Sequence, residues 1–194
     1  MGIFIHFALS CTMLSSNELL QAFQQFCNTL PEPLEDLEPL DDSLQLQQEL
    51  GAKGAAFEPI IQEGSGGFIA FWQEPAAGER PVVWLNGDGS PMAVCANDLA
   101  EFLTLLPYGT GLIREVLDVS EEYRRRPEGL LILDSIYSKE ETDVLLAKAS
   151  SSVANVEYMK WLMETAELAP ADDPVRTITR AFATHQNLAV WLRS

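Results

Sequence analysis

The chain has few positive charges, and those few are unevenly placed. Its 194 residues carry 12 lysines and arginines against 29 aspartates and glutamates, a net charge of −17. Only Lys53 and Arg80 among the basic residues precede residue 114, whereas 15 of the acidic residues do. Because no basic surface is present to neutralise phosphates, nucleic acids and anionic membranes are poor partners. A basic protein is the partner that this charge favours, although solubility alone also explains an acidic composition.

The motifs of common active sites are missing as well. There are two histidines, His6 and His185, and no H-x-x-x-H, C-x-x-C or G-x-S-x-G pattern. Zinc sites and the usual hydrolase nucleophile therefore have no support. Carboxylates are so abundant that pairs of them say nothing about acid–base catalysis. We predict a protein that is not an enzyme and that has no cofactor and no metal.

Long apolar runs and paired cysteines are also lacking. No run approaches the roughly 18 apolar residues of a membrane-spanning helix. The cysteines Cys11, Cys27 and Cys95 are odd in number and widely spaced, which favours small buried side chains and a reducing cytoplasm. Residues 1–12 lack the positive charge of a secretory signal, so we expect an extra strand or a segment upstream of a natural start at Met13.

Residues 66–106 are the best-punctuated part of the chain. Three strand-like runs, at residues 67–73, 81–86 and 92–95, are separated by turns rich in glycine and proline. Asn97 then resembles an N-cap for a helix that Pro107 ends. A β-meander that leads into a helix is typical of the α+β class.

The flanking segments are mostly helical. Ser15 and Glu18 form a capping box for a helix that ends at Pro31, and a short helix is expected from Asp42 or Ser43 to residue 50. Residues 53–63 look irregular or strand-like. After residue 108 the pattern is helical, with a last helix from Asp173 through residue 192. We predict an α+β core at residues 1–107 and a helical C-terminal part at 108–194 packed on it.

Two sets of residues are candidates for partner binding. Residues 31–42 are dense in acidic side chains and form either a solvated loop or a contact surface for a basic partner. Neighbouring strand residues face opposite sides, so either helices cover both faces of the meander or one face is a binding surface anchored by an exposed aromatic ring. The candidate contact residues are Glu35, Asp36, Glu38, Asp41, Asp42, Trp72, Trp84 and the turn residue Asp88.

The central stretch resembles the SUKH superfamily, which includes Syd-like proteins and regulators of glucan synthesis. The likeness rests on the glycine pair Gly66 and Gly67, the strand at residues 81–84, the small residues at 94–96 and the helix at 99–106. Bacterial members of that superfamily are largely immunity proteins that bind and neutralise a toxin, often a nuclease or deaminase. The resemblance thus implies a cytoplasmic toxin inhibitor. The alternative is a regulatory or scaffold module that binds a cellular protein or a small ligand.

Overall fold

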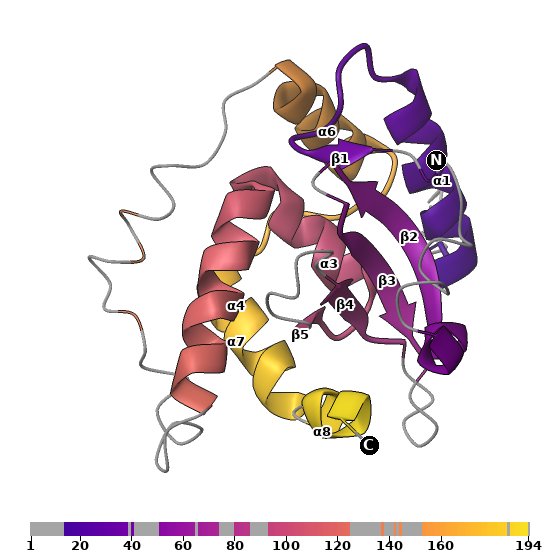
Figure 1. Ribbon diagram of the computed structural model, residues 1–194. Coiled ribbons are helices and arrows are strands. Elements are labelled where there is room, and N and C mark those ends of the chain that lie inside the picture. The colour runs from indigo at the N-terminus through magenta and orange to yellow at the C-terminus, as the bar shows by residue number, and fades with distance from the viewer. Residues whose placement is uncertain are drawn as a thin grey trace, which may run out of the picture.

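Five antiparallel strands form one sheet in the computed structural model, which describes residues 14–38, 40, 51–64, 66–73, 80–85, 93–124, 137, 142, 144, 153–185 and 187–193. Each strand pairs with the next one along the chain, in the order β1-β2-β3-β4-β5 (Figure 1). The strands are β1 (Leu37–Glu38), β2 (Phe57–Glu63), β3 (Phe68–Trp72), β4 (Val82–Leu85) and β5 (Ala93–Ala96). The predicted α+β class and its meander are confirmed.

The helices lie on both sides of this sheet. They are α1 (Ser16–Thr29), α3 (Leu99–Leu105), α4 (Thr110–Arg124), α6 (Val153–Glu164), α7 (Pro174–Thr184) and α8 (Asn187–Arg193), with short 3-10 helices η1 (Gly51–Ala56) and η2 (Leu106–Tyr108). None of the helices in the described ranges is both long and apolar enough to cross a bilayer.

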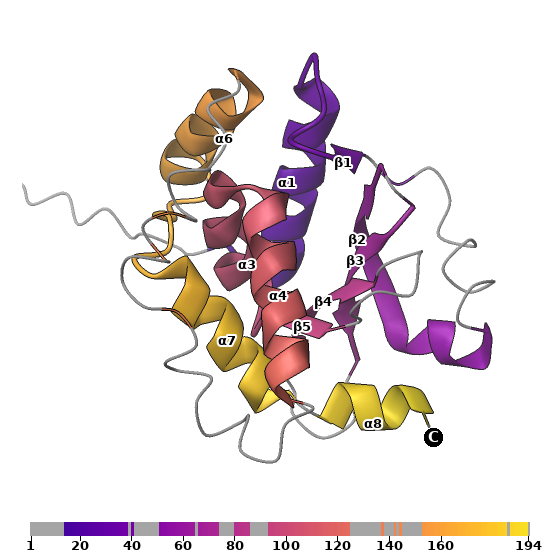
Figure 2. The same cartoon turned by 60° about the vertical axis from the view of Figure 1, so that its left-hand side comes forward.

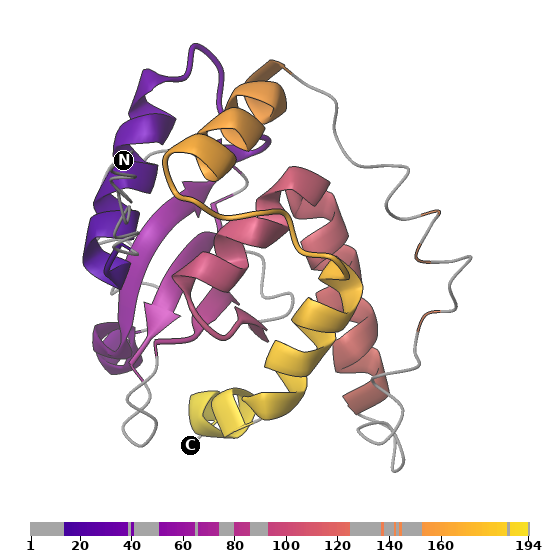
Figure 3. The ribbon, with the colours of Figure 1, turned by 180° about the vertical axis from the view of Figure 1, so that it is seen from behind.

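Alternation along the strands divides the apolar side chains between two cores. Phe71 of β3 belongs to a first core that also contains residues of α1, α3, α4, α6 and α7. Its neighbour Trp72 belongs to a second, smaller core on the opposite face, which Leu188 of α8 joins. Figure 3 shows the sheet from the side that α1, α3 and α6 cover. Both faces of the central strands are buried, since every residue of β3, β4 and β5 is buried, and α8 contributes to this at one end of the second face.

The helix caps follow the sequence closely, with one shift. Ser15 and Glu18 form the predicted capping box, in which the Ser15 amide donates to Glu18 Oε2 over 2.8 Å. The N-cap of α3 is Asp98, whose Oδ1 accepts from the Glu101 amide, and the prediction of Asn97 is wrong by one residue. Asn97 instead donates from its own amide and its side chain to Glu101 Oε2. Both residue types accept at an N-cap, so composition alone could not choose between them.

The predicted last helix is two helices. Asp173 caps α7 and Pro174 occupies its first position, as expected, but the backbone leaves helical geometry at His185 with φ −110° and ψ 40°. The chain then turns so that Leu188 of α8 enters the second core. The free energy gained by burying that face of the sheet exceeds the free energy lost by interrupting the helix.

Two side chains of α6 donate hydrogen bonds to the end of α3 and to η2. Tyr158 Oη of α6 donates to the Leu103 carbonyl over 2.7 Å, and Asn155 Nδ2 donates to the Pro107 carbonyl over 3.2 Å. Carbonyls at a helix end lack partners within the helix, so these bonds satisfy groups that would otherwise be orphaned. Residues on both sides of position 107 share the first core. The division into parts 1–107 and 108–194 stays a prediction.

Candidate functional site

The predicted acidic contact residues separate into different environments. Asp36 and Glu38 are exposed, Glu38 lying in the edge strand β1, whereas Glu35 is half-buried. Asp41, Asp42 and Asp88 lie outside the described residues, as does most of the helix predicted before residue 50. Only Asp36 and Glu38 of the described set thus present carboxylates to a partner.

Glu35 is turned toward the start of α4. Its backbone has a positive φ of 55°, which is uncommon for a residue with a side chain. Its Oε2 lies 3.5 Å from the point where a Cβ on Gly109 would sit, and Oε1 is buried with no hydrogen-bond partner in the described ranges. Gly109 directly precedes α4, and a carboxylate near a helix N-terminus is favoured by the helix dipole. Glu35 is therefore placed to stabilise the fold at this turn.

Glu63 is a second carboxylate near the same helix. It ends β2 opposite Leu37, and its side chain is 0% exposed. Its Oε1 accepts from Arg114 Nη1 over 2.9 Å, and its Oε2 is buried with no hydrogen-bond partner among the residues that the structure describes. The guanidinium of Arg114 offsets part of the desolvation cost of this carboxylate.

We call Glu63 and Arg114 the buried ion pair. Sequence reasoning missed this pair, although one signal was present: Glu63 follows Ile61 by two positions and so occupies a core-facing position of its strand. The partner Arg114 lies 51 residues away and gives no signal of its own. In the described ranges no group of three or more histidine, cysteine, aspartate or glutamate side chains is arranged to hold a metal ion. The buried ion pair is suited to a structural role.

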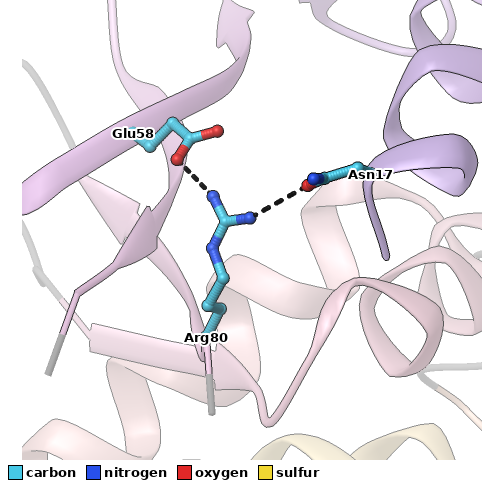
Figure 4. Close-up of polar contacts among 3 residues, drawn as sticks. All are labelled: Asn17, Glu58 and Arg80. Atoms are coloured by element: carbon cyan, nitrogen blue, oxygen red, sulfur yellow. Dashed lines mark hydrogen bonds and ion pairs between the residues drawn. The ribbon is translucent and has the colours of Figure 1, made fainter. Parts of the chain in front are cut away.

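The Arg80 side chain contacts three elements of the fold, α1, β2 and β3. Its guanidinium donates to Glu58 of β2 and, over 3.3 Å, to Asn17 Oδ1 of α1 (Figure 4). It also lies 4.0 Å from the centre of the Phe71 ring, a cation–π arrangement. The positive charge of Arg80 is thus engaged with groups of the chain itself.

Lys53, in the 3-10 helix that precedes β2, is engaged in a similar way. Its Nζ donates to the carbonyls of Trp191 and Leu192 over 2.9 and 2.8 Å and lies 5.4 Å from the centre of the Trp191 ring. Both basic residues of positions 1–113 therefore have internal partners. Asp36 and Glu38, by contrast, form no ion pair among the described residues.

The two tryptophans predicted as anchors are buried in this conformation, and their role in partner binding stays a prediction. Trp72 and Trp84 are each 1% exposed. Trp84 lies in the first core, and Trp72 lies in the second core with its ring 6.0 Å from that of Trp191. Both indole N–H groups are buried without an acceptor among the described residues. Periodicity showed that neighbouring rings face opposite sides, but it could not show that both sides are buried.

The described cysteines are packed rather than reactive. Burial raises the pKa of the Cys27 thiol to about 12 and also raises the pKa of Cys95. Both thiols are therefore neutral at physiological pH, and a neutral thiol is a poor nucleophile. His185 is buried too, at the end of α7.

The chain matches no known protein family, no curated protein and no solved structure. Charge, burial and geometry therefore carry the assignment of function.

Proposed function

We propose that this chain is a non-enzymatic, acidic binding protein that neutralises a basic partner by covering its positive surface. The observation that carries the proposal is the charge imbalance of the first 113 residues, where both basic side chains are engaged internally. The surplus of negative charge in this part is then available to an approaching partner. A SUKH-like immunity protein acting on a toxin domain is the form of this proposal that the sequence resemblance favours.

The exposed carboxylates of Asp36 and Glu38 are the contact residues in this proposal. They lie at and beside β1, which is the edge of the sheet within the described part of the chain. The backbone there is fixed, since the Gly64 amide donates to the Asp36 carbonyl over 2.7 Å. Because the backbone is already fixed, only the side chains remain to be ordered on binding. Opposite charges also speed the encounter of two proteins, and the gain falls as salt screens them.

Affinity capture from the lysate of the native cells tests the proposal. The expected result is one basic protein that is recovered at low salt and weakened at high salt. The matched variants are Asp36→Asn with Glu38→Gln, and Glu157→Gln with Glu164→Gln on the exposed side of α6, because each pair removes two negative charges. We expect the first pair to slow association about tenfold and the second pair to have a much smaller effect.

Two outcomes would count against the proposal. If no basic protein is captured at either salt concentration, the acidity serves solubility, and the regulatory or scaffold alternative is favoured. If both pairs of variants slow association equally, the attraction is a general property of an acidic protein and Asp36 and Glu38 are not its contact site.

A further inference from the structure

Helix α8 covers one end of the second face of the sheet. It has only seven residues and follows the break at His185 (Figure 2). Leu188 is buried in the second core, and Trp191 and Leu192 are half-buried against it, whereas Val190 is 69% exposed. The helix thus has one apolar side, with side chains at positions i, i+3 and i+4, seated on the sheet.

Aromatic rings make the principal contact beneath α8. The Trp191 ring lies 5.8 Å from the Phe57 ring, edge to face, and 6.0 Å from the Trp72 ring. Phe57 and Trp72 are cross-strand partners on β2 and β3. They form an aromatic platform on strands that are themselves held in the sheet.

Lys53 provides a polar attachment of α8. Lys53 of η1 donates to the carbonyls of Trp191 and Leu192, the last part of the helix. Carbonyls at a helix C-terminus lack internal partners, and a cation is favoured there by the dipole. Lys53 therefore holds the C-terminal end of α8 against η1.

The closed position carries a cost as well as a gain. Trp72 is 1% exposed, and no group in the described part of the chain accepts a hydrogen bond from its buried indole N–H. A buried donor without a partner is unfavourable, and opening would return it to water. A helix of seven residues is also far too short to be stable without the sheet. The opening of α8 is therefore expected to need much less free energy than global unfolding.

We propose that α8 is a lid that pivots at His185 and uncovers Phe57 and Trp72 as a docking surface for an amphipathic helix. The occupant is identified by the helix that is seated there now: a partner helix with large apolar side chains at positions i, i+3 and i+4, one of them aromatic. This inference rests on the fold and not on the toxin-binding proposal. It also gives Trp72 a route to a partner that its burial in the closed state denies.

Hydrogen exchange on the full chain tests the lid. In the wild type we expect α8 amides to exchange at least tenfold faster than those of α7. Lys53→Gln should accelerate exchange in α8 a further tenfold or so and leave α7 unchanged, because it removes two charge-assisted hydrogen bonds. Lys160→Gln, at an exposed position of α6, is the control with the same change of charge. Exchange of α8 and α7 at one common rate, or equal acceleration of both by Lys53→Gln, would show that α8 is no lid.

A labelled peptide of residues 185–194 then tests the docking surface by fluorescence anisotropy. We expect it to bind the Trp191→Ala chain at least several-fold more tightly than the wild type, because this substitution weakens the competing α8 and leaves the docking surface and Lys53 in place for the peptide. The same peptide with Trp191→Ala is the control and should bind at least tenfold more weakly. Failure of the peptide to bind, or equal binding of both peptides, would overturn the docking surface while leaving the acidic contact site of the proposed function untouched.

Discussion

Gly109 offers the sharpest test of how the acidic turn is joined to α4. Its φ of 85° and ψ of 151° lie in a region that residues with a side chain rarely adopt. An added Cβ would lie 3.5 Å from Glu35 Oε2, which is ordinary van der Waals contact. The cost of Gly109→Ala should therefore come from the backbone and amount to about 1–3 kcal/mol. Reduced freedom of the unfolded chain offsets about 0.4–1 kcal/mol of it.

Gly111→Ala is the matched control two residues later. Gly111 is exposed in the first turn of α4, and nothing lies within 4 Å of an added Cβ. Alanine is favoured over glycine in a helix, so this variant should be stabilised by up to about 1 kcal/mol. The two variants differ from the wild type by the same methyl group, and we expect their free energies of unfolding to differ by about 2 kcal/mol.

Urea unfolding followed by circular dichroism measures that difference. For a chain of this size each kcal/mol corresponds to roughly 2–4 °C in Tm, which gives an independent check. The Glu35→Ala background separates the two causes, since a backbone cost persists there and a contact cost disappears. Equal stability of Gly109→Ala and Gly111→Ala would refute the reasoning, as would loss of the difference in the Glu35→Ala background.

Arg114→Met leaves the Glu63 carboxylate buried without its guanidinium and should cost about 2 kcal/mol, less than for a fully buried pair because the Arg114 side chain is 38% exposed. Adding Glu63→Gln should recover part of that loss in urea unfolding, and strictly additive effects would contradict the coupling. The raised pKa of Cys27, about 12 against an ordinary 9.0, favours the neutral thiol in the fold. The stabilisation that the neutral buried thiol gives the folded state is therefore complete below pH 9 and is lost between pH 9 and about 12. Cys27→Ala removes this loss, so the urea midpoint of the variant should fall less steeply than that of the wild type over this range. Equal slopes for the two proteins would contradict the prediction. Arg80→Lys keeps the charge but loses the planar stacking on Phe71, which should lower the free energy of unfolding by about 0.5–1 kcal/mol; a thermal midpoint equal to that of the wild type would exclude this role.

Several elements were predictable because their signals are local. The Ser15 capping box, the three central strands and the Asp173 start of α7 each depend on residues within a few positions of one another. The pleat of a strand likewise requires neighbours such as Phe71 and Trp72 to lie on opposite faces of the sheet. The position of the α3 cap was wrong by one residue, because Asn97 and Asp98 are equally able to accept the bond.

The candidate site was much less predictable. The acidic segment was visible in the sequence, but its division into inward-facing Glu35 and exposed Asp36 and Glu38 was not. The pairing of Glu63 with Arg114 joins residues 51 positions apart, and that of Lys53 with Trp191 joins residues 138 apart. No local pattern records such contacts, since they form only when the sheet and helices pack.

The amino-acid sequence by itself determined the negative charge, the meander and the starts of α1 and α7, because charge is a sum and local structure follows nearest neighbours and periodicity. Tertiary structure alone decided which charges remain exposed and which aromatic rings are buried. It did so because burial depends on what packs against a residue. The strand position of Trp72 is equally compatible with a half-exposed ring, and the ring is buried here because α8 packs against it.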